Sequence, residues 1–407
     1  MKRKRSFPRD VPFFPRNNQY LREVKRGIIL RYLLSGESFS QAELSKLLEL
    51  NPSTTSIIVN ELKEEKLIVE TSLAASTPRG GKRPLLLGVN KDNVGIFALS
   101  LRTPKSNIFL LNLAGDVLMK STITFKPEEV PERIPSCLST RILSLKKRYL
   151  RSFPSFRILA TGIVLEAMMN PDSGEILYSV GLRAKKFPFA EPIEKATGIP
   201  VFVENTVIAE ALQEYWFGKA QGMQNFLYLK TFPAIRSVLF HNGSILYGAN
   251  CIAGEIGASL GVVDQKNYAF LSDVLEHNIF GLPSLKAYLQ EASEQVSPSS
   301  AYKDAKLLQS QQSLIEKNLD SFATILGQII CNLITYYDPK LILLGKIPRS
   351  LQNQALNTIK QEIARHLYMV SPEEYSILCT KKERNHIQLG ILSMVMERFI
   401  DAKSSLS

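Results

Sequence analysis

The sequence predicts an α/β protein in which a small winged helix-turn-helix domain precedes a larger region of alternating strands and helices. Three observations support this fold class. Two short capped helices and two strand-like runs follow one another between residues 40 and 89, strand-like and helical runs alternate from about residue 92, and the composition of 45% hydrophobic and 22% charged residues is ordinary for a globular protein.

The distribution of charge favours a polyanionic partner for the first part of the chain. The 407 residues carry a net charge of +12. Residues 1–90 hold 16 Lys and Arg against 9 Asp and Glu, so this short stretch has a net charge of +7. Such an asymmetry is typical of proteins that bind nucleic acid.

The composition argues against several other classes of protein. The four cysteines and four histidines are scattered, without the spacing of a metal site or a disulfide framework. The chain has no continuous apolar run long enough for a membrane span, and its basic N-terminus lacks the apolar stretch of a secretory signal. We therefore expect a cytoplasmic protein that binds no metal.

Residues 1–19 are rich in Arg, Lys, Pro and Asn, and we expect a flexible basic arm there, either a solubilising tail or a segment that touches phosphates. A helix is predicted over residues 20–34. Ser40 and Glu43 form the pattern of a capping box, which predicts a helix running to about residue 48 with Leu44, Leu47 and Leu48 facing inward. Asn51 and Pro52 then predict the start of a third helix over residues 52–65.

The third helix has the pattern of a recognition helix. Helical geometry places Thr55, Ile58, Val59 and Leu62 on one side, which must pack on the first two helices. Small polar side chains and one isoleucine then face outward, where they suit base edges, phosphates and thymine methyl groups. The candidate DNA-contacting residues of this helix are Ser53, Thr54, Ser56, Ile57 and Asn60.

Two strands, over residues 67–71 and 85–89, are expected to form a wing after the third helix. The loop between them carries Arg79, Lys82 and Arg83 around a Gly-Gly pair, and these cations are candidates for contacts with phosphates or the minor groove. A plain solvated turn is the alternative. Residues 20–90 are thus predicted to form the DNA-binding domain.

Residues 91–407 are expected to form a second domain, an α/β domain in two similar halves. Hairpins are predicted over 94–113 and 237–246, a helix over 129–151, and strands over 158–164, 199–203 and 225–229. A long helix over 313–337 is expected to precede a buried strand over 340–344.

The chain resembles the ROK family, named for repressors, open reading frames and kinases, and in particular its transcriptional-repressor branch. The resemblance covers about residues 17–400. It rests on a combination of stretches: GGKRP closing the wing, TGIVLEAMMNPDSGEILYS, GIPVFVENTVIAEALQEYWFG, NGSILYGANCIAGEIGASLG and NLITYYDPKLILLGK. The resemblance implies a two-lobed, actin-like fold with a ribonuclease-H-like core and a sugar site in the cleft.

The resemblance also shows what this sequence lacks relative to the kinases of the family. Glycine-rich turns bind ATP there because glycine lets backbone N–H groups approach the phosphates. The corresponding stretches are residues 100–104 and 232–238, which have no glycine, and Gly345-Lys346 replaces a Gly-Gly pair. Thr206 stands where the kinases place the catalytic aspartate, and a threonine hydroxyl without a base cannot accept the proton of a sugar hydroxyl. We expect no catalytic residues, no ATP and no cofactor.

The family's zinc site is also missing from this sequence. Ala258 follows Glu255-Ile256-Gly257 where the family has histidine, and residues 259–275 contain no cysteine. The family's sugar site is retained only in part, as Asn205, Glu255 and the neighbouring Glu204, whose amide and carboxylates could hold sugar hydroxyls. These three residues are the candidate ligand-binding set.

The combined prediction is a cytoplasmic transcriptional regulator that acts as a repressor of carbohydrate-related genes. It would bind a palindromic operator in double-stranded DNA as a homodimer or a dimer of dimers, and a sugar or sugar derivative would be its effector. One alternative is a sugar kinase with an appended DNA-binding domain. Another is a regulator with a vestigial cleft that is controlled by a protein partner.

Overall fold

The computed structural model describes residues 18–73, 83–102, 104–125, 131–231, 235–262, 268–270, 319–345, 347, 351–367, 369, 371–381 and 385–405. The chain divides into two compact units, residues 1–222 with 383–407 and residues 223–382. The first unit therefore contains both the N-terminal segment and the C-terminal helix. The flexible arm expected over residues 1–19 lies outside the described residues, except that the first helix already begins at Asn18.

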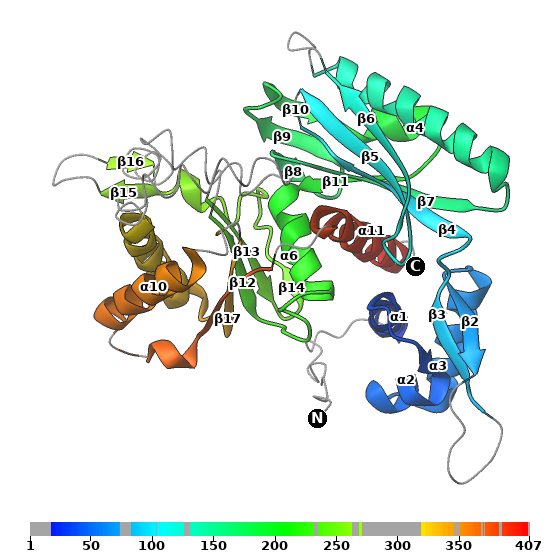
Figure 1. Ribbon diagram of the computed structural model, residues 1–407, viewed down its shortest axis with the longest axis horizontal. Coiled ribbons are helices and arrows are strands. Elements are labelled where there is room, and N and C mark those ends of the chain that lie inside the picture. Colours follow the sequence, from blue (N-terminus) through cyan, green and yellow to red (C-terminus); the bar gives the residue numbers. More distant parts are fainter. Residues whose placement is uncertain are drawn as a thin grey trace, which may run out of the picture. The chain divides into compact units, whose positions relative to one another are not determined.

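The first unit begins with three helices and a three-stranded antiparallel sheet, which together make up the N-terminal segment, residues 18–90 (Figure 1). The sheet has the strand order β1-β3-β2. The elements are α1 (Asn18–Leu34), β1 (Phe39–Ser40), α2 (Gln41–Leu47), α3 (Pro52–Glu64), β2 (Ile68–Leu73) and β3 (Leu85–Val89). The three helices and the strands β2 and β3 follow the sequence prediction in order and type, whereas β1 was not predicted.

The capping box and the buried face of α3 are confirmed. The Ser40 hydroxyl accepts from the Glu43 backbone N–H, and the Glu43 carboxylate accepts from the Ser40 backbone N–H. Thr55, Ile58, Val59 and Leu62 are the buried residues of α3. The amphipathic pattern therefore located this helix and its core side.

The prediction that Leu47 faces inward is wrong, because its side chain is 37% exposed. Leu44 and Ser45 are the buried residues of α2. With about 100° of rotation per residue, Leu47 lies about 110° from the middle of that buried face. The Ser45 hydroxyl can be buried because it donates to the Gln41 carbonyl oxygen of the preceding turn.

A five-stranded sheet forms the centre of the rest of the first unit, with the order β11-β7-β4-β5-β6. β4, β5 and β6 form an antiparallel meander, and β7 and β11 run parallel to β4. The strands are β4 (Val94–Ser100), β5 (Lys105–Asn112), β6 (Val117–Thr124), β7 (Arg157–Leu165) and β11 (Val201–Asn205).

Helices cover both faces of this sheet (Figure 1). On one face, α4 (Arg133–Ser152) packs its apolar side against Phe97, Leu99 and Ile163. On the other face lies α11 (His386–Ser405), which approaches so closely that a Cβ at Gly162 would lie 2.5 Å from the Ile391 side chain. α6 (Thr206–Trp216) packs against α11.

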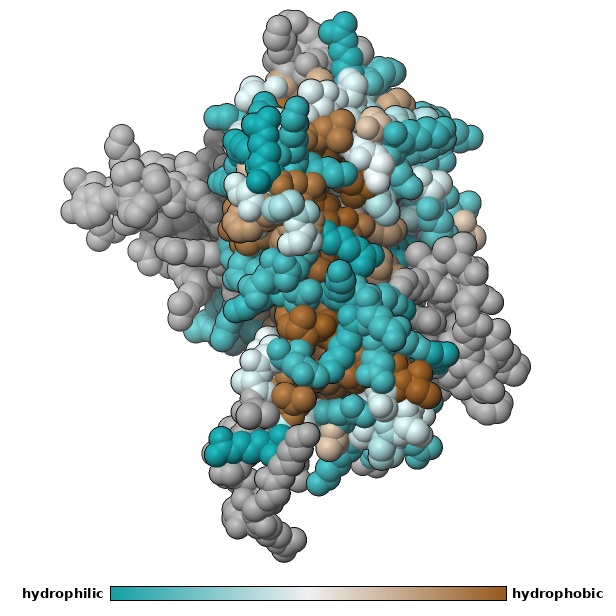
Figure 2. Space-filling model, turned by 90° about the vertical axis from the view of Figure 1, so that its right-hand side faces the viewer, coloured by the Kyte–Doolittle hydropathy of each residue, from teal (hydrophilic) through white to brown (hydrophobic). Residues whose placement is uncertain are grey.

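A smaller antiparallel sheet and one further helix complete the first unit. The sheet has the order β10-β9-β8. The elements are β8 (Met168–Asn170), β9 (Glu175–Ser179), β10 (Ala184–Pro188) and α5 (Ala190–Thr197). In the view of Figure 2, apolar residues form bands between hydrophilic ones.

The second unit is built on another five-stranded sheet, with the order β14-β13-β12-β17-β18. Its central strands β12 and β17 are buried along their whole length, as expected for strands covered on both faces, although β12 ends in the charged Lys230. The elements are β12 (Phe226–Lys230), β13 (Arg236–His241), β14 (Ser244–Ile245), η1 (Ile256–Ala258), β15 (Leu260–Val262), β16 (Tyr268–Phe270), β17 (Leu341–Gly345), α10 (Gln352–His366), η4 (Pro372–Glu374) and β18 (Ser376–Cys379).

One helix of the described residues, Leu319–Tyr337, is long and apolar enough to cross a membrane by length and composition. Its side chains Phe322, Leu326 and Ile330 are buried in the hydrophobic core of the second unit, which accounts for its composition. The helix expected over 313–337 is therefore confirmed from residue 319, and residues 313–318 lie outside the described part. The helix expected over 129–151 is α4, which begins at Arg133.

Candidate functional site

The outer face of α3 is the first candidate site. Ser53, Ile57 and Asn60 are exposed, and Thr54 and Ser56 are half-buried beside them. Ile57 is 52% exposed, although the other apolar side chains of α3 face the core and isoleucine is one of the residue types that is most often buried. The structure thus brings the five predicted residues together on or beside one solvent-facing surface.

The predicted wing is described only at its base. β2 and β3 pair in antiparallel fashion, with an irregularity between Glu70 and Ser72. Arg83 is exposed just before β3. Arg79 and Lys82 lie outside the described residues, so their part in the site remains a prediction.

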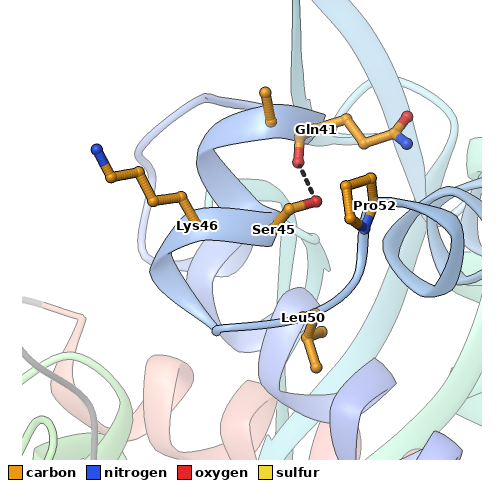
Figure 3. Close-up of a pocket in the computed structure, with 6 residues that line it drawn as sticks. Gln41, Ser45, Lys46, Leu50 and Pro52 are labelled. Carbon is orange, nitrogen blue, oxygen red and sulfur yellow. Dashed lines mark hydrogen bonds between the residues drawn. The ribbon is translucent and has the colours of Figure 1, made fainter.

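A shallow pocket of about 530 Å³ lies between α2 and the start of α3 (Figure 3). It is lined by Gln41, Ala42, Ser45, Lys46, Leu50 and Pro52. The Ser45 hydroxyl is already bonded to the Gln41 carbonyl oxygen, and the side chains of Gln41 and Lys46 point away from one another. These six residues offer no convergent set of polar groups for a small molecule.

The second candidate site surrounds the end of β11, where Glu204 and Asn205 lie side by side and are both almost fully buried. Asn205 is the N-cap of α6, and its Oδ1 accepts from the Val207 N–H at 3.0 Å. Its Nδ2 donates to the Ala167 carbonyl oxygen at 2.7 Å. The Asn205 amide therefore joins the end of the strand, the helix and the 165–168 turn, which is a structural role.

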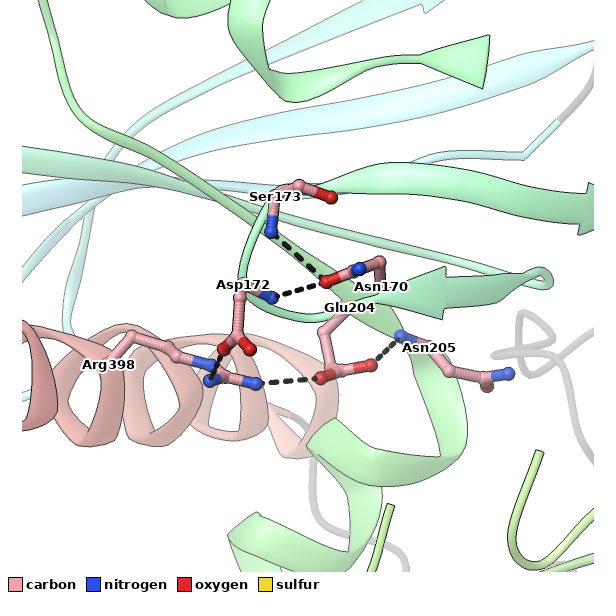
Figure 4. Close-up of polar contacts among 6 residues, drawn as sticks. All are labelled: Asn170, Asp172, Ser173, Glu204, Asn205 and Arg398. Atoms are coloured by element: carbon pink, nitrogen blue, oxygen red, sulfur yellow. Dashed lines mark hydrogen bonds and ion pairs between the residues drawn. The ribbon is translucent and has the colours of Figure 1, made fainter. Parts of the chain in front are cut away.

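The Glu204 carboxylate is also engaged within the protein (Figure 4). Its Oε1 accepts from the Asn205 N–H at 2.7 Å, and its Oε2 lies 3.5 Å from Nη2 of Arg398. Arg398 also approaches the exposed Asp172 carboxylate at 3.4 Å, and so lies between two carboxylates. Sequence reasoning missed Arg398, because it lies almost 200 residues from Glu204 on the C-terminal helix and no local pattern marks it.

The third predicted ligand, Glu255, belongs to the second unit. Its Oε2 lies 3.1 Å from Nε of Arg236, and both side chains are mostly buried. Arg236 is part of the stretch that corresponds to the second glycine-rich turn of the kinases. A cation of this stretch thus binds the carboxylate that was predicted to hold a sugar.

The stretch that corresponds to the first glycine-rich turn is closed by its own hydrogen bonds. The Arg102 N–H donates to the Ser106 hydroxyl at 2.9 Å, and that hydroxyl donates to the Arg102 carbonyl oxygen at 2.7 Å. The Leu101 N–H donates to the Val164 carbonyl oxygen. The backbone N–H groups of Leu101 and Arg102 are therefore bonded within the chain and not available to a phosphate. Residues 103, 232–234 and 346 of the three stretches lie outside the described residues.

Thr206 follows Asn205 as the first residue of α6 and is 3% exposed. Within the part of the chain that the structure describes, no group of three or more His, Cys, Asp or Glu side chains could hold a metal ion. Ala258 ends the short helix η1 that follows Glu255.

Comparison with known proteins assigns the fold. A model of the ROK family matches residues 99–398. The xylose repressor of Caldicellulosiruptor bescii is 23% identical over 93% of this chain and 97% of its own length. A crystal structure described as a ROK family transcriptional regulator, a homologue of the Escherichia coli MLC protein, has a TM-score of 0.72 at 21% identity and covers 95% of this chain and 98% of its own.

A kinase of the family is also similar in structure. The ROK hexokinase from Thermus thermophilus has a TM-score of 0.54 at 22% identity, and the match covers 75% of this chain and 99% of the hexokinase. The regulator therefore matches almost the whole chain, whereas the kinase matches three quarters of it. The resemblance found in the sequence is confirmed by these matches.

Proposed function

Since the chain belongs to the ROK family, we propose that it is a DNA-binding transcriptional repressor of carbohydrate-related genes. Its similarity to a xylose repressor extends over nearly the full length of both chains, and so includes the N-terminal segment. The observation that carries the proposal is the outer face of α3, where Ser53, Ile57 and Asn60 are exposed above a buried apolar side.

In this proposal the N-terminal segment is a winged helix-turn-helix domain. The short helix α2, the tight turn to α3 and the strand order β1-β3-β2 support that assignment. α3 enters the major groove, where Asn60 reaches a base edge and Ile57 meets a thymine methyl group. The loop with Arg79, Lys82 and Arg83 contacts phosphates.

The remaining residues form a two-lobed, actin-like region that supplies dimerisation and senses an effector. A symmetric dimer would bind a palindromic operator in double-stranded DNA, with half-sites about one helical turn or a multiple apart. The name of the similar repressor makes a sugar such as D-xylose the first effector to test. The protein acts in the cytoplasm, where its DNA is.

Phosphoryl transfer has no support among the described residues of the site. Thr206 stands where the kinases of the family have the catalytic aspartate. Ser106 accepts a hydrogen bond from the Arg102 N–H, which a nucleotide would need, and Arg236 pairs with the Glu255 carboxylate, which a sugar would need. We expect purified protein to give no sugar-dependent turnover of ATP in a coupled assay. Measurable turnover would favour the kinase alternative.

The engagement of all three predicted sugar ligands favours one second candidate function. Asn205 caps α6, Glu204 bonds Asn205 and Arg398, and Glu255 pairs with Arg236. In this alternative the cleft is vestigial and a partner protein releases the repressor from DNA. Calorimetry with a panel of sugars separates the two, because heat of binding supports the sensor and its absence across the panel supports the partner.

The repressor proposal is tested by selecting fragments of genomic DNA with the purified protein and sequencing them. We expect a recurring palindrome near genes of carbohydrate use.

Asn60→Ala should relax sequence preference at one position of each half-site, at a cost of about 1–3 kcal/mol in binding to the preferred site. Arg83→Ala should weaken binding to all duplexes alike and flatten the salt dependence. Selection of no common sequence would refute the proposal.

A further inference from the structure

Helix α4 accounts for the whole excess of positive charge in the chain beyond residue 90. Residues 91–407 contain 34 basic and 29 acidic residues, a net charge of +5. α4 by itself contains six basic residues and no acidic one, so the rest of that region has a net charge of −1. The six are Arg133, Arg141, Lys146, Lys147, Arg148 and Arg151.

Packing of α4 on the sheet turns these cations toward solvent. The helix buries Ile134, Leu138, Ile142 and Leu145 against the sheet. The basic face, defined as Arg133, Arg141, Lys147, Arg148 and Arg151, is exposed, and Lys146 is half-buried at its edge. In Figure 1 α4 lies at the top of the view.

Among the residues that the structure describes, no carboxylate pairs with the basic face. None of its five residues forms an ion pair with another residue among those that the structure describes. Lys147 and Arg151 are spaced i,i+4 and Arg148 and Arg151 i,i+3, spacings at which like charges destabilise a helix. By contrast, the exposed Arg365 of α10 pairs with Glu362 on its own helix. An unbalanced face of this kind is best explained by an anion that comes from outside the chain.

The length of the basic face fits an extended polyanion better than a single anionic group. Arg133 and Arg151 are separated by 18 residues, which is about 27 Å along a helix axis. Four of the five cations are arginine, whose guanidinium group binds phosphate through two parallel hydrogen bonds. The sugar-phosphate backbone of a duplex offers phosphates at regular spacing over such a length.

We propose that the basic face of α4 is a second DNA-binding surface, which holds the phosphate backbone of duplex outside the bases that α3 reads. The choice of DNA as the polyanion, in place of an acidic protein, rests on the proposed function. The surface is separate from α3, since α4 covers one face of the sheet while α11, which packs against α1, covers the other. Non-specific DNA held there would raise the effective concentration of operator near α3.

The test compares two variants with the same change in charge. The first is Arg141→Gln, Lys147→Gln, Arg148→Gln and Arg151→Gln together. The matched control changes four exposed lysines on other elements or loops, Lys91, Lys105, Lys185 and Lys360, to Gln. Binding to a random duplex of about 40 base pairs is followed by fluorescence anisotropy at several salt concentrations, and circular dichroism verifies that both variants are folded.

We expect the α4 variant to bind the random duplex about 10- to 100-fold more weakly than the native protein, with a salt slope shallower by about 3. The control should stay within about threefold of the native affinity. A short duplex that spans only the selected operator should bind the native protein and the α4 variant equally. Equal losses in the α4 variant and the control would overturn the proposal, as would competition by polyglutamate as strong as that by DNA at equal charge.

Failure of this proposal is distinguishable from failure of the repressor function. The random-duplex measurement is repeated with Asn60→Ala and Arg83→Ala combined, in the native and the α4-variant backgrounds. The second surface predicts that the α4 substitutions weaken binding in both backgrounds. If the α4 substitutions have no effect while Asn60→Ala still alters operator preference, the second surface is wrong and the repressor function stands.

Discussion

At the scale of single residues, Arg31 links the N-terminal segment to the rest of the first unit. Its Nη2 donates to Glu397 at 2.6 Å, and its guanidinium lies 4.5 Å and 5.0 Å from the ring centroids of Tyr215 and Trp216. Trp216 also donates to the same Glu397 oxygen at 2.7 Å. Burial lowers the pKa of Arg31, but Glu397 and Tyr215 outweigh it and raise the pKa above its ordinary value.

Arg31→Ala is therefore expected to lower the free energy of unfolding by roughly 1–3 kcal/mol. A fully buried pair loses about 3–5 kcal/mol when one partner is removed, and Glu397 is partly exposed, which reduces the penalty. Trp216 is the only tryptophan, so its fluorescence during urea unfolding reports on this junction. Arg22→Ala, which removes a more exposed pair with Glu61, serves as the control and should cost less than about 1 kcal/mol.

Tyr32, next to Arg31, supplies a prediction of pH dependence. Burial raises the pKa of its hydroxyl well above the ordinary value of 10. Above about pH 10 the unfolded chain loses this proton while the folded chain keeps it, so stability must fall as the pH rises. Tyr32→Phe should remove part of the fall in melting temperature between pH 9 and 11, whereas Tyr178→Phe, at an exposed position, should not. Identical profiles for native protein and Tyr32→Phe would contradict this.

At the scale of elements, the sequence predicts what depends on local pattern. The face of α3 and the capping box of α2 follow from spacing and side-chain type, and both are confirmed. The burial of Leu47 was predicted wrongly because α2 is only seven residues long, and one turn of apolar residues does not fix which side meets the core. The bond from the Asn205 side chain to the Ala167 carbonyl oxygen was not predictable, because Ala167 is distant in sequence.

The capping box should control the stability of α2 and, through it, the placement of α3. Ser40→Ala removes the acceptor for the Glu43 N–H and should cost about 1 kcal/mol of stability. In the repressor proposal it should also weaken operator binding, since α2 supports the recognition helix. Ser371→Ala, at the capping box of η4 in the second unit, is the matched control. Its operator affinity should equal that of the native protein, and an equal loss in both variants would argue against a local effect.

At the scale of the molecule, the first compact unit is formed by two distant parts of the sequence, residues 1–222 and 383–407, while the division into functional domains at residue 90 stays a prediction. α11 follows the whole second unit in sequence but packs in the first, against α1, α6 and β7. The sequence analysis made no prediction for this helix. Its place in the first unit depends on long-range contacts, which no local pattern shows.

Two helices of the first unit join the Glu204 region to the N-terminal segment. α6 begins at the Asn205 cap and ends at Tyr215 and Trp216, which contact Arg31. On α11, Arg398 lies beside Glu204 while the adjacent Glu397 holds Arg31. A shift of either helix would thus alter both the surroundings of Glu204 and the contacts of Arg31. This gives a physical route from the Glu204 region to the N-terminal segment.

This route predicts that substitutions at its two ends are energetically coupled. Arg31→Lys and Arg398→Gln should together change the free energy of unfolding by an amount that differs from the sum of the single changes by more than about 0.5 kcal/mol, because both act on α11. In the control cycle, Arg31→Lys is combined with Arg365→Gln, whose side chain pairs with Glu362 in the second unit. That cycle should be additive, since the two sites share no partner. Additivity in both cycles would mean that α6 and α11 hold the two ends independently.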